Sequence, residues 1–500
     1  MYKFLLCWRY LRTRYIALAT IISVTLGVAT MIVVNAVMSG FSHEMKTRLH
    51  DILSDIVIEH RSLVGMYDAE RHMEKIREIG GDQIVGMTPT AFIPAMLRFT
   101  VNGEHITRQV NVVGIDVETY STVSEFGKYL QHPENRQQLK FDLRNGGYDI
   151  IDHQAEDPAK AIPRLAMEMA GWHYRQQKAA FQQSLAPEPS SEVATEENPF
   201  AALDAQQGKI FNPATDQHVG CVLGMGIGSF KTPDGADNFQ LLPGDDVDIS
   251  YPTAGHPPKV QHAKFTVVDF YESKMQDYDS TYMFVPLAWL QELRGMIDPQ
   301  TGARYVNSIQ IKLAPGADLD AFRDLLQSHF PQHSYVVSTW RDKQGPLLAA
   351  VQQETILLNI LLFLIVLVSG FGILAIFFMI VVEKTRDIGI LKSLGASGGG
   401  VMQIFLIYGL GLGLVGAGVG SLGGVLFAQN INAIGDMVAY MTGRPVFPPD
   451  IYFFSKIPAR ISPLMVLCVG SGAVLVAVLA SILPAWRAAS LHPVKALRFE

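Results

Sequence analysis

Four long apolar stretches divide the 500-residue chain. They cover residues 16–38, 356–382, 401–428 and 462–484, and none of them contains Asp, Glu, Lys or Arg. Each is longer than the roughly 20 residues that a helix needs to cross the hydrocarbon core of a bilayer. The pattern therefore predicts a membrane protein with four transmembrane α-helices. The first stretch also exceeds the apolar core of a signal peptide, which indicates an uncleaved anchor.

Between the first two stretches lies a polar segment, residues 39–345, whose apolar positions alternate as in strands or recur as in helices. Two alternating runs meet at Asn102 and Gly103, a pair typical of a tight hairpin turn. One helix is expected to start at Asp68 and another to cover residues 159–181. Further strands are expected at 55–60, 246–251, 264–271, 281–287, 307–313 and 334–339, with a helix at 318–330. The segment is therefore predicted to be a large α+β domain.

The two ends of this domain have similar patterns, which predicts one subdomain built from residues 54–116 and 305–340 and a second from residues 117–304. Within the second, residues 184–207 are rich in Pro, Ser, Glu and Gln, which predicts a disordered insertion. The spans on both sides of the domain are expected to continue outward as stalks. Nothing breaks a helix over residues 346–382, and such a helix would be roughly 55 Å long against a bilayer core of about 30 Å.

Charge is divided unevenly along the chain. The spans and their flanks hold 13 Lys and Arg against 5 acids, whereas residues 39–355 hold 27 basic and 42 acidic residues. An acidic domain carried on a basic membrane segment argues against nucleic acid as a partner. Basic residues gather in the tail 1–15, the loop 383–400 and the tail 485–500, so the positive-inside rule places these three in the cytoplasm. The large domain and the loop 429–461 would then lie outside.

The charged loop between the second and third spans must lie at the membrane surface. Ile388 and Leu391 are three residues apart, which predicts a short amphipathic helix. Ile390 and Leu394, four residues apart, are expected on the same broad face, and Gly395 follows where a C-terminal cap would lie. The side chains expected in solvent are Lys384, Arg386, Asp387 and Lys392. Two interpretations stay open, a docking helix for a cytoplasmic partner and a basic loop that only anchors the spans.

Glycine is frequent in the third span. Two matches to GxGxxG occur there, but they lie inside an apolar helix with no preceding strand and do not indicate a dinucleotide site. Small residues four apart instead allow close helix packing, either within the chain or between subunits. The glycines of this stripe are Gly409, Gly413, Gly416, Gly420 and Gly424. The sequence also lacks a GxxxxGKS/T phosphate loop, HExxH and paired CxxC, so we expect no catalytic, cofactor or metal site, and nucleotide would have to bind to another subunit.

Several motifs together resemble the FtsX-like, or MacB-type, permease family of ABC transporters. They are EKTRDIGILKSLGA after the second span and LPAWRAASLHPVKALRFE at the C-terminus, in a chain with one span, a large external domain and three further spans. Within this family, VMSGF at residues 37–41, VVGID at residues 112–116 and the ALRFE ending are most similar to the lipoprotein-releasing LolC/LolE permeases.

The resemblance implies roles for particular residues. The coupling helix, which would dock on a cytoplasmic ATPase, would comprise Glu383, Lys384, Arg386, Asp387, Ile388, Ile390, Leu391, Lys392, Leu394 and Gly395. The lateral entry for acyl chains would be lined by Val37, Met38, Ser39, Gly40 and Phe41. The two-ended subdomain would be Porter-like and the middle one Sabre-like. The loop with Tyr251, Pro252, Pro257 and Pro258 takes the place of the family's chaperone-contacting hook, with a plain connecting loop as the alternative.

The resemblance thus implies an inner-membrane permease subunit that releases lipoproteins for transfer to the outer membrane, by mechanotransmission from a separate ATPase. The expected partners are a LolD-like ATPase dimer that binds ATP and Mg, a second permease copy or paralogue, lipoprotein cargo and a LolA-like periplasmic chaperone. Two alternatives share the architecture. One is a MacB-like export permease for peptides or small molecules, and the other is an FtsX-like signalling scaffold that controls an external enzyme.

Overall fold

The computed structural model describes residues 15–497 except 63, 102, 156–157, 160, 186–210, 233–235, 255–256 and 443–455. Almost all of the predicted insertion at 184–207 and of the N-terminal tail therefore lies outside the described residues. The chain divides into two compact units. A helical unit is built from residues 1–45, 346–447 and 456–500, and an α/β unit from residues 46–345 together with 448–455.

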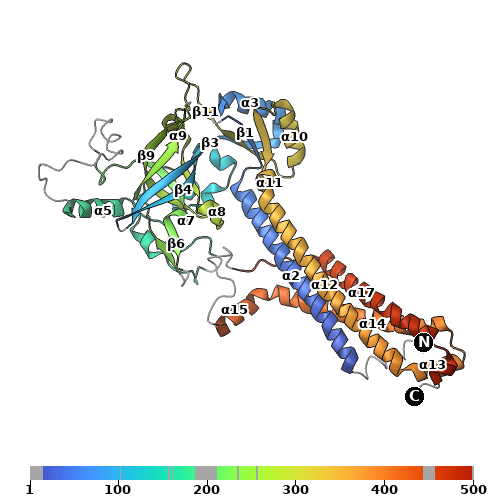
Figure 1. Ribbon diagram of the computed structural model, residues 1–500. Helices are drawn as coiled ribbons and strands as arrows, with labels where there is room; N and C mark the ends of the chain where they lie inside the picture. The colour runs from blue at the N-terminus through green and yellow to red at the C-terminus, as the bar shows by residue number, and fades with distance from the viewer. Residues whose placement is uncertain are drawn as a thin grey trace. The chain divides into compact units, whose positions relative to one another are not determined.

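Four helices in the described part of the chain are long and apolar enough to cross a membrane (Figure 1). They are α2 (Tyr15–Ile52), α12 (Gly345–Glu383), α14 (Gly398–Gln429) and α17 (Pro463–Ser490). The four predicted spans are confirmed. Both α2 and α12 continue beyond the bilayer thickness as predicted, since the 39 residues of α12 correspond to about 58 Å. Among the described residues, the helical unit also contains three shorter helices, α13 (Thr385–Ser393), α15 (Ile431–Thr442) and α18 (Pro493–Leu497).

The glycine stripe lets α14 approach two other spans closely, and all five of its glycines are buried. Gly409 and Gly413 face α17, where a Cβ on Gly413 would lie 2.9 Å from the Ala477 Cβ. The next three glycines of the stripe face α2, where a Cβ on Gly420 would lie 2.7 Å from the Thr25 carbonyl oxygen. The stripe therefore packs α14 between α17 and α2 within this chain.

The α/β unit contains a nine-stranded sheet in the order β13-β1-β12-β3-β4-β10-β5-β9-β8. The strands are β1 (Ile56–His60), β3 (Ile84–Val101), β4 (Glu104–Ile115), β5 (Val219–Gly224), β8 (Asp246–Pro252), β9 (Val260–Tyr271), β10 (Tyr282–Pro286), β12 (Ser308–Leu313) and β13 (Tyr335–Thr339). Because β8 also pairs with β3, the six strands from β3 to β8 in this order close into a barrel. The other three strands, β12, β1 and β13, extend from β3 as an open sheet.

The 18-residue strand β3 belongs to both parts of this sheet. Its first half pairs with β12, and its second half pairs with β4 across the hairpin predicted at Gly103. Gly103 has a positive φ of 86°, which a glycine adopts without strain in a tight turn. The barrel thus includes β4 and half of β3, which the sequence analysis assigned to the two-ended subdomain. Ile93, Leu97 and Phe265 fill its interior.

Two amphipathic helices cover the open sheet, α3 (Ala69–Gly80) and α10 (Leu319–His329), and both were predicted. Asp68 caps α3 by accepting a hydrogen bond from the Arg71 amide at 3.2 Å. Shorter elements are β2 (Met66–Tyr67), β11 (Tyr305–Val306), β6 (Ser229–Lys231), β7 (Asp237–Phe239), α4 (Pro133–Gln137), α5 (Trp172–Leu185), α7 (Met225–Gly228), α8 (Gln276–Asp279), α9 (Leu287–Arg294) and α11 (Trp340–Lys343). Single 3-10 turns are η1 (Gly81–Gln83), η2 (Tyr120–Thr122), η3 (Phe126–Tyr129) and η4 (Leu165–Met169).

The prediction of one helix over residues 159–181 was wrong. The structure has the turn η4 followed by α5, which starts at Trp172. Gly171 separates them with a positive φ of 104°, and a Cβ there would lie 2.4 Å from the Arg144 carbonyl oxygen. The helical spacing is therefore interrupted by a close backbone contact that comes from elsewhere in the chain. The strand β5 was not predicted, because its six residues, VGCVLG, are apolar or glycine and lack alternation.

Candidate functional site

The helix α13 lies between the spans α12 and α14, where the coupling helix was expected. At its start, the Thr385 hydroxyl donates to the Val381 carbonyl oxygen at 2.9 Å. After its end, Gly395 has a positive φ of 95°, and its amide donates to the Lys392 carbonyl oxygen at 3.1 Å. Local sequence therefore fixes both ends of this helix.

The apolar residues of α13 do not share one broad face, so this part of the prediction was wrong. Ile388 is 4% exposed and belongs to the apolar core of the helical unit. Ile390 and Leu394 are 43% and 81% exposed on the opposite side, and Leu391 lies half-buried between the two sides. At 100° per residue, position 390 is 200° from position 388, which explains the separation. Ile388 thus anchors one side of α13 in the helical unit, and Ile390 and Leu394 form an exposed apolar edge on the other side.

Lys392 was expected in solvent, and the structure corrects this. Its ammonium group donates to the carbonyl oxygens of Ala489 at 2.8 Å and Leu491 at 2.6 Å. These carbonyls belong to the C-terminal end of α17, where backbone acceptors have no partner inside the helix and a positive charge is favourable. Lys392 therefore ties α13 to the last turn of the fourth span.

The remaining charged residues of α13 lie at its surface. Lys384 forms an ion pair with Asp387 at 2.9 Å, three residues further along. Glu383 and Arg386 are exposed near the start of the helix. The surface of α13 thus combines charged groups at its start with the apolar edge of Ile390 and Leu394.

The predicted entry residues Val37, Met38, Ser39, Gly40 and Phe41 lie inside α2. Gly40 is buried, and a Cβ there would lie 2.0 Å from the Pro458 carbonyl oxygen. One turn earlier, the Ala36 carbonyl oxygen accepts a hydrogen bond from the Arg460 amide at 2.9 Å. Gly40 is therefore needed so that residues 456–461 can pack on α2. Its four neighbours in the motif are half-buried or exposed.

The predicted chaperone-contact loop connects β8 and β9. Tyr251 is only 1% exposed, and its hydroxyl donates to the Leu293 carbonyl oxygen at 3.3 Å. Pro252 pairs with Val260 within the hairpin. Tyr251 belongs to the core and cannot contact a partner, which corrects its assignment. Pro257 and Pro258 are exposed.

Sequence reasoning missed the place where both stalks join the α/β unit. Asp55, just after α2, accepts hydrogen bonds from His50 at 2.8 Å and from the Leu313 amide at 2.8 Å. Its own carbonyl oxygen accepts from the Trp340 amide at the start of α11, a few residues before α12. Burial raises the pKa of Asp55, but the bonds from His50 and Leu313 outweigh burial and lower it below the usual value. Asp55 thus links the end of α2 to the start of α11, the short helix that precedes α12 in the chain.

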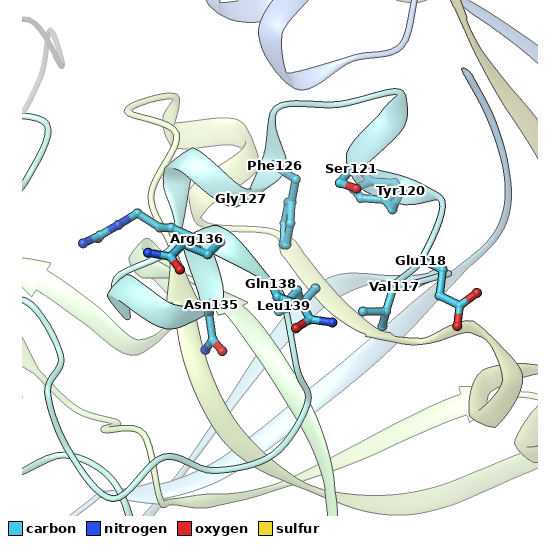
Figure 2. A pocket seen from close by; sticks show the side chains of 11 residues that line it. Val117, Glu118, Tyr120, Ser121, Phe126, Gly127, Asn135, Arg136, Gln138 and Leu139 are labelled. Carbon is cyan, nitrogen blue, oxygen red and sulfur yellow. The ribbon is translucent and has the colours of Figure 1, made fainter. Parts of the chain in front are cut away.

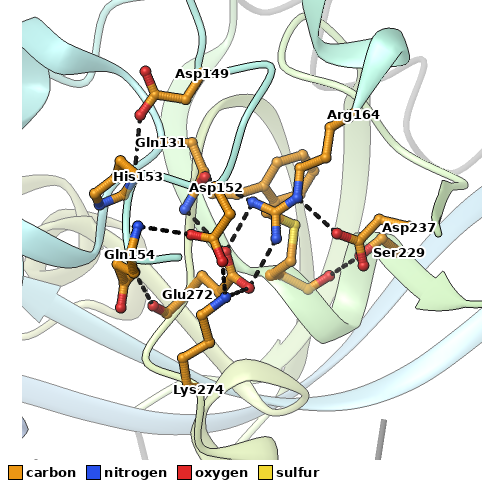
Figure 3. A network of polar contacts seen from close by, with 12 residues as sticks. Gln131, Asp149, Asp152, His153, Gln154, Arg164, Ser229, Asp237, Glu272 and Lys274 are labelled. Atoms are coloured by element: carbon orange, nitrogen blue, oxygen red, sulfur yellow. Dashed lines mark hydrogen bonds and ion pairs between the residues drawn. The ribbon is translucent and has the colours of Figure 1, made fainter. Parts of the chain in front are cut away.

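A buried ionic cluster on the barrel was also missed (Figure 3). The Arg164 guanidinium donates to Glu272 at 2.9 Å and to Asp237 at 2.6 Å. Lys274 donates to the same Glu272 at 2.6 Å and also contacts Asp152. Burial raises the pKa of Glu272, but the charges of Arg164 and Lys274 outweigh burial and lower it to about 2. A carboxylate directly after the apolar run of β9 was the only signal in the sequence.

Figure 2 shows a pocket of the α/β unit lined by residues 117–139. Its apolar wall includes Tyr120 and Phe126, and its polar wall includes Asn135 and Arg136. Arg136 already forms an ion pair with Asp149 at 2.5 Å, and the amide group of Asn135 donates to Asp269 at 2.8 Å. These polar groups therefore hold the segment on the barrel.

The described residues combine four candidate membrane spans, a short helix between the second and third of them, and an α/β domain between the first and second. Residues 359–493 match the family model described as FtsX-like permease C-terminal. This segment starts in α12 and contains α13, α14 and α17. The membrane segments from α12 onward are therefore similar to the C-terminal part of FtsX-like permeases, the family that the motifs resemble.

The most informative relatives are lipoprotein-releasing permeases. The chain is 25% identical to the lipoprotein-releasing system transmembrane protein LolE of Haemophilus influenzae, over 99% of this chain and 98% of LolE. It is 29% identical to LolC of Xylella fastidiosa, over 47% of this chain and 55% of LolC, so this match spans about half of the relative. Among solved structures, the extracellular domain of the noncanonic ABC-type transporter YknZ from Gram-positive bacteria matches 57% of this chain and 99% of that domain, with 12% identity and a TM-score of 0.22.

Proposed function

We propose that this chain is the permease subunit of an ABC transporter that releases lipoproteins from the inner membrane, and that a separate ATPase binds ATP and Mg. The observation that carries the proposal is α13, which exposes Ile390 and Leu394 while Ile388 and Lys392 bind it to the spans. Exposed apolar patches mark contacts with protein or membrane, and we propose a protein, the ATPase, as the contact of α13. The similarity to LolE along nearly the whole chain supports lipoprotein as the cargo.

The proposal includes an orientation. The basic residues around α13 and in both tails place these segments in the cytoplasm by the positive-inside rule. The α/β unit, inserted between the first and second spans, then lies in the periplasm, together with the connection between α14 and α17. The ATPase, a LolD-like dimer, would contact α13 from the cytoplasmic side.

Movement of the ATPase would reach the periplasm through the long helices. A shift of α13 acts directly on α17 through Lys392 and on α12 through the chain connection at Lys384. The helix α12 is continuous from Glu383 to Gly345, so it transmits displacement as a rod. Near its far end, Asp55 links the end of α2 to α11, which directly precedes α12, so the two stalks would move together. This coupling is the physical basis of the proposed mechanotransmission.

The remaining partners follow from the same proposal. A second permease copy or paralogue would complete the membrane cavity, and the half-buried residues Val37, Met38 and Phe41 would meet the acyl chains of the cargo. A LolA-like chaperone would contact the exposed Pro257 and Pro258. The buried Tyr251 has no part in that contact.

The ATPase contact is tested by Leu394→Asp in the full-length protein. A carboxylate on the exposed edge should remove most ATPase from a co-purified complex, because burying an unpaired charge at an interface is costly. Leu394→Met, which keeps an apolar side chain, is the matched control and should retain the complex. Leu391→Asp is a poorer test, since that side chain is half-buried in the helical unit. Unchanged co-purification of Leu394→Asp would exclude this edge as the docking site.

Cargo is tested by reconstituting the permease with its ATPase and a labelled lipoprotein in vesicles. ATP-dependent transfer of the lipoprotein to a soluble acceptor is the expected result. Transport of a peptide without lipoprotein transfer would instead indicate a MacB-like exporter. ATP-dependent activation of an external enzyme with neither kind of transport would indicate an FtsX-like scaffold.

A further inference from the structure

The helix α15 begins where the third span ends. Asn430 ends α14, since its side-chain amide donates to the Leu426 carbonyl oxygen at 2.8 Å. The Asn430 carbonyl oxygen then accepts from the Ile434 amide at 3.0 Å in the first turn of α15. Within the helical unit, α15 turns away from the bundle of spans (Figure 1). Because α15 links the third and fourth spans, it lies at the membrane surface opposite to α13.

This helix is amphipathic, and its apolar half is exposed at Met437 and Met441 and half-buried at its other positions. At 100° per residue, one half contains Ile431, Ile434, Met437, Val438 and Met441. The other half contains the polar residues Asn432 and Asp436. None of the residues of α15 is buried, and Met437, Tyr440 and Met441 are 58%, 92% and 76% exposed. Exposure of these large apolar side chains to water is unfavourable.

The polar half holds α15 in place. The Asn432 side chain accepts a hydrogen bond from the Ile457 amide at 2.7 Å and donates to the Ile457 carbonyl oxygen at 3.3 Å. The same short segment, residues 456–461, packs on α2 through Gly40 and Ala36. At 100° per residue, the exposed side chains of Met437 and Met441 lie on the side of α15 away from Asn432 and its attachment.

Charge near this attachment matches a lipid surface. Lys456 and Arg460 are exposed on the segment that holds Asn432. Basic side chains beside an interfacial helix bind the phosphates of anionic lipids, while its apolar half enters the boundary between headgroups and acyl chains. The continuity of α15 with a span puts it at the height of this boundary.

We infer that α15 is an interfacial membrane helix, with Met437 and Met441 among the lipid acyl chains and Lys456 and Arg460 at the phosphates. The ligand class is an anionic phospholipid surface in the leaflet opposite to α13. The inference goes beyond the proposed function, because it requires neither the ATPase nor the cargo. The helix would hold the α14–α17 connection in the leaflet beside the VMSGF turn of α2.

Site-specific fluorescence tests this inference on the full-length protein in vesicles that contain phosphatidylglycerol. Cys7 and Cys468 are replaced, the buried Cys221 is kept, and a single cysteine is placed by Met441→Cys or Asp436→Cys. Both positions are exposed, but they lie on opposite halves of α15. Each is labelled with a polarity-sensitive fluorophore and quenched either by lipids spin-labelled near the headgroup or by aqueous iodide.

The label at position 441 should emit at shorter wavelength and be quenched several-fold more by the spin-labelled lipid than the label at position 436. The label at position 436 should be quenched mainly by iodide. Equal iodide quenching of both labels would overturn the inference, since the helix would then lie in water. Protection of position 441 from both quenchers, with disulfide cross-linking between two copies, would overturn it in favour of a protein interface.

Discussion

The helical unit and the α/β unit are each stabilised internally, but by different kinds of contact. In the helical unit, α14 approaches its neighbours through small residues such as Gly413 and Gly420. In the α/β unit, large side chains such as Phe265 and Tyr271 fill the sheet, and Arg164 is buried with its carboxylate partners. Lipid gives apolar helices no hydrophobic reason to associate, whereas water drives apolar side chains inward. Added side-chain volume should therefore destabilise the helical unit most. Loss of a buried charge should destabilise the α/β unit most.

The largest effect is expected from Arg164→Ala. It leaves Glu272 and Asp237 buried without their guanidinium partner, which should cost about 3–5 kcal/mol of unfolding free energy. Thermal unfolding of the detergent-purified protein, followed by tryptophan fluorescence, measures the loss. Arg323→Ala is the matched control, since Arg323 also binds carboxylates but lies on the surface of α10, and it should cost no more than about 1 kcal/mol. Equal losses would show that burial does not distinguish the two arginines.

A somewhat smaller effect is expected from Gly420→Leu in α14. The new side chain would begin 2.7 Å from the Thr25 carbonyl oxygen and force α2 away, at a cost of about 1–3 kcal/mol. Gly423→Leu is the matched control, because a Cβ there meets nothing within 4 Å. Unfolding temperatures in the same detergent compare the two variants. If both lower the temperature alike, the loss does not come from the close approach of α14 and α2 at Gly420.

Lys392→Met should have a smaller effect on stability, about 1 kcal/mol, because it removes two charged hydrogen bonds at a partly exposed site. Its effect on coupling should be larger. ATPase co-purification should persist, since the edge of Ile390 and Leu394 is unchanged, while ATP-driven release falls. Lys392→Arg keeps the charge and the donors and should restore release. Full release by Lys392→Met would remove this side chain from the transmission path.

The last change concerns the response to pH. Burial raises the pKa of Asp279 in the α/β unit to about 7, so its ionisation opposes folding. The folded state binds the proton of Asp279 more tightly than the unfolded state does. The stability gained in this way is present at low pH and is lost as the pH rises from about 4 through 7. Asp279→Asn should therefore flatten the fall in unfolding temperature between pH 5 and 8 (roughly the range in which the carboxyl titrates). A variant with the same pH profile as the parent would assign that fall to other groups.

Much of the architecture could be predicted because it depends on neighbours in the sequence. The hairpin follows from Gly103, the start of α3 from Asp68, and the end of α13 from Gly395. The helix expected over residues 159–181 failed because the Arg144 backbone, distant in sequence, requires Gly171 to leave helical geometry. The prediction that the apolar residues of α13 share one broad face failed for a related reason. Spacing alone cannot tell which apolar residue meets the spans and which remains exposed.

The sequence by itself determined the four spans, the stalks, the inserted α+β domain and the position of the surface helix, since these follow from the length and period of apolar runs. Only the tertiary structure decided that six strands close into a barrel, that Asp55 links the end of α2 to α11, and that Lys392 donates hydrogen bonds to the end of α17. The physical reason is that burial, hydrogen-bond partners and charge pairs depend on residues brought together from distant parts of the chain. Periodicity describes one element, whereas a contact requires two.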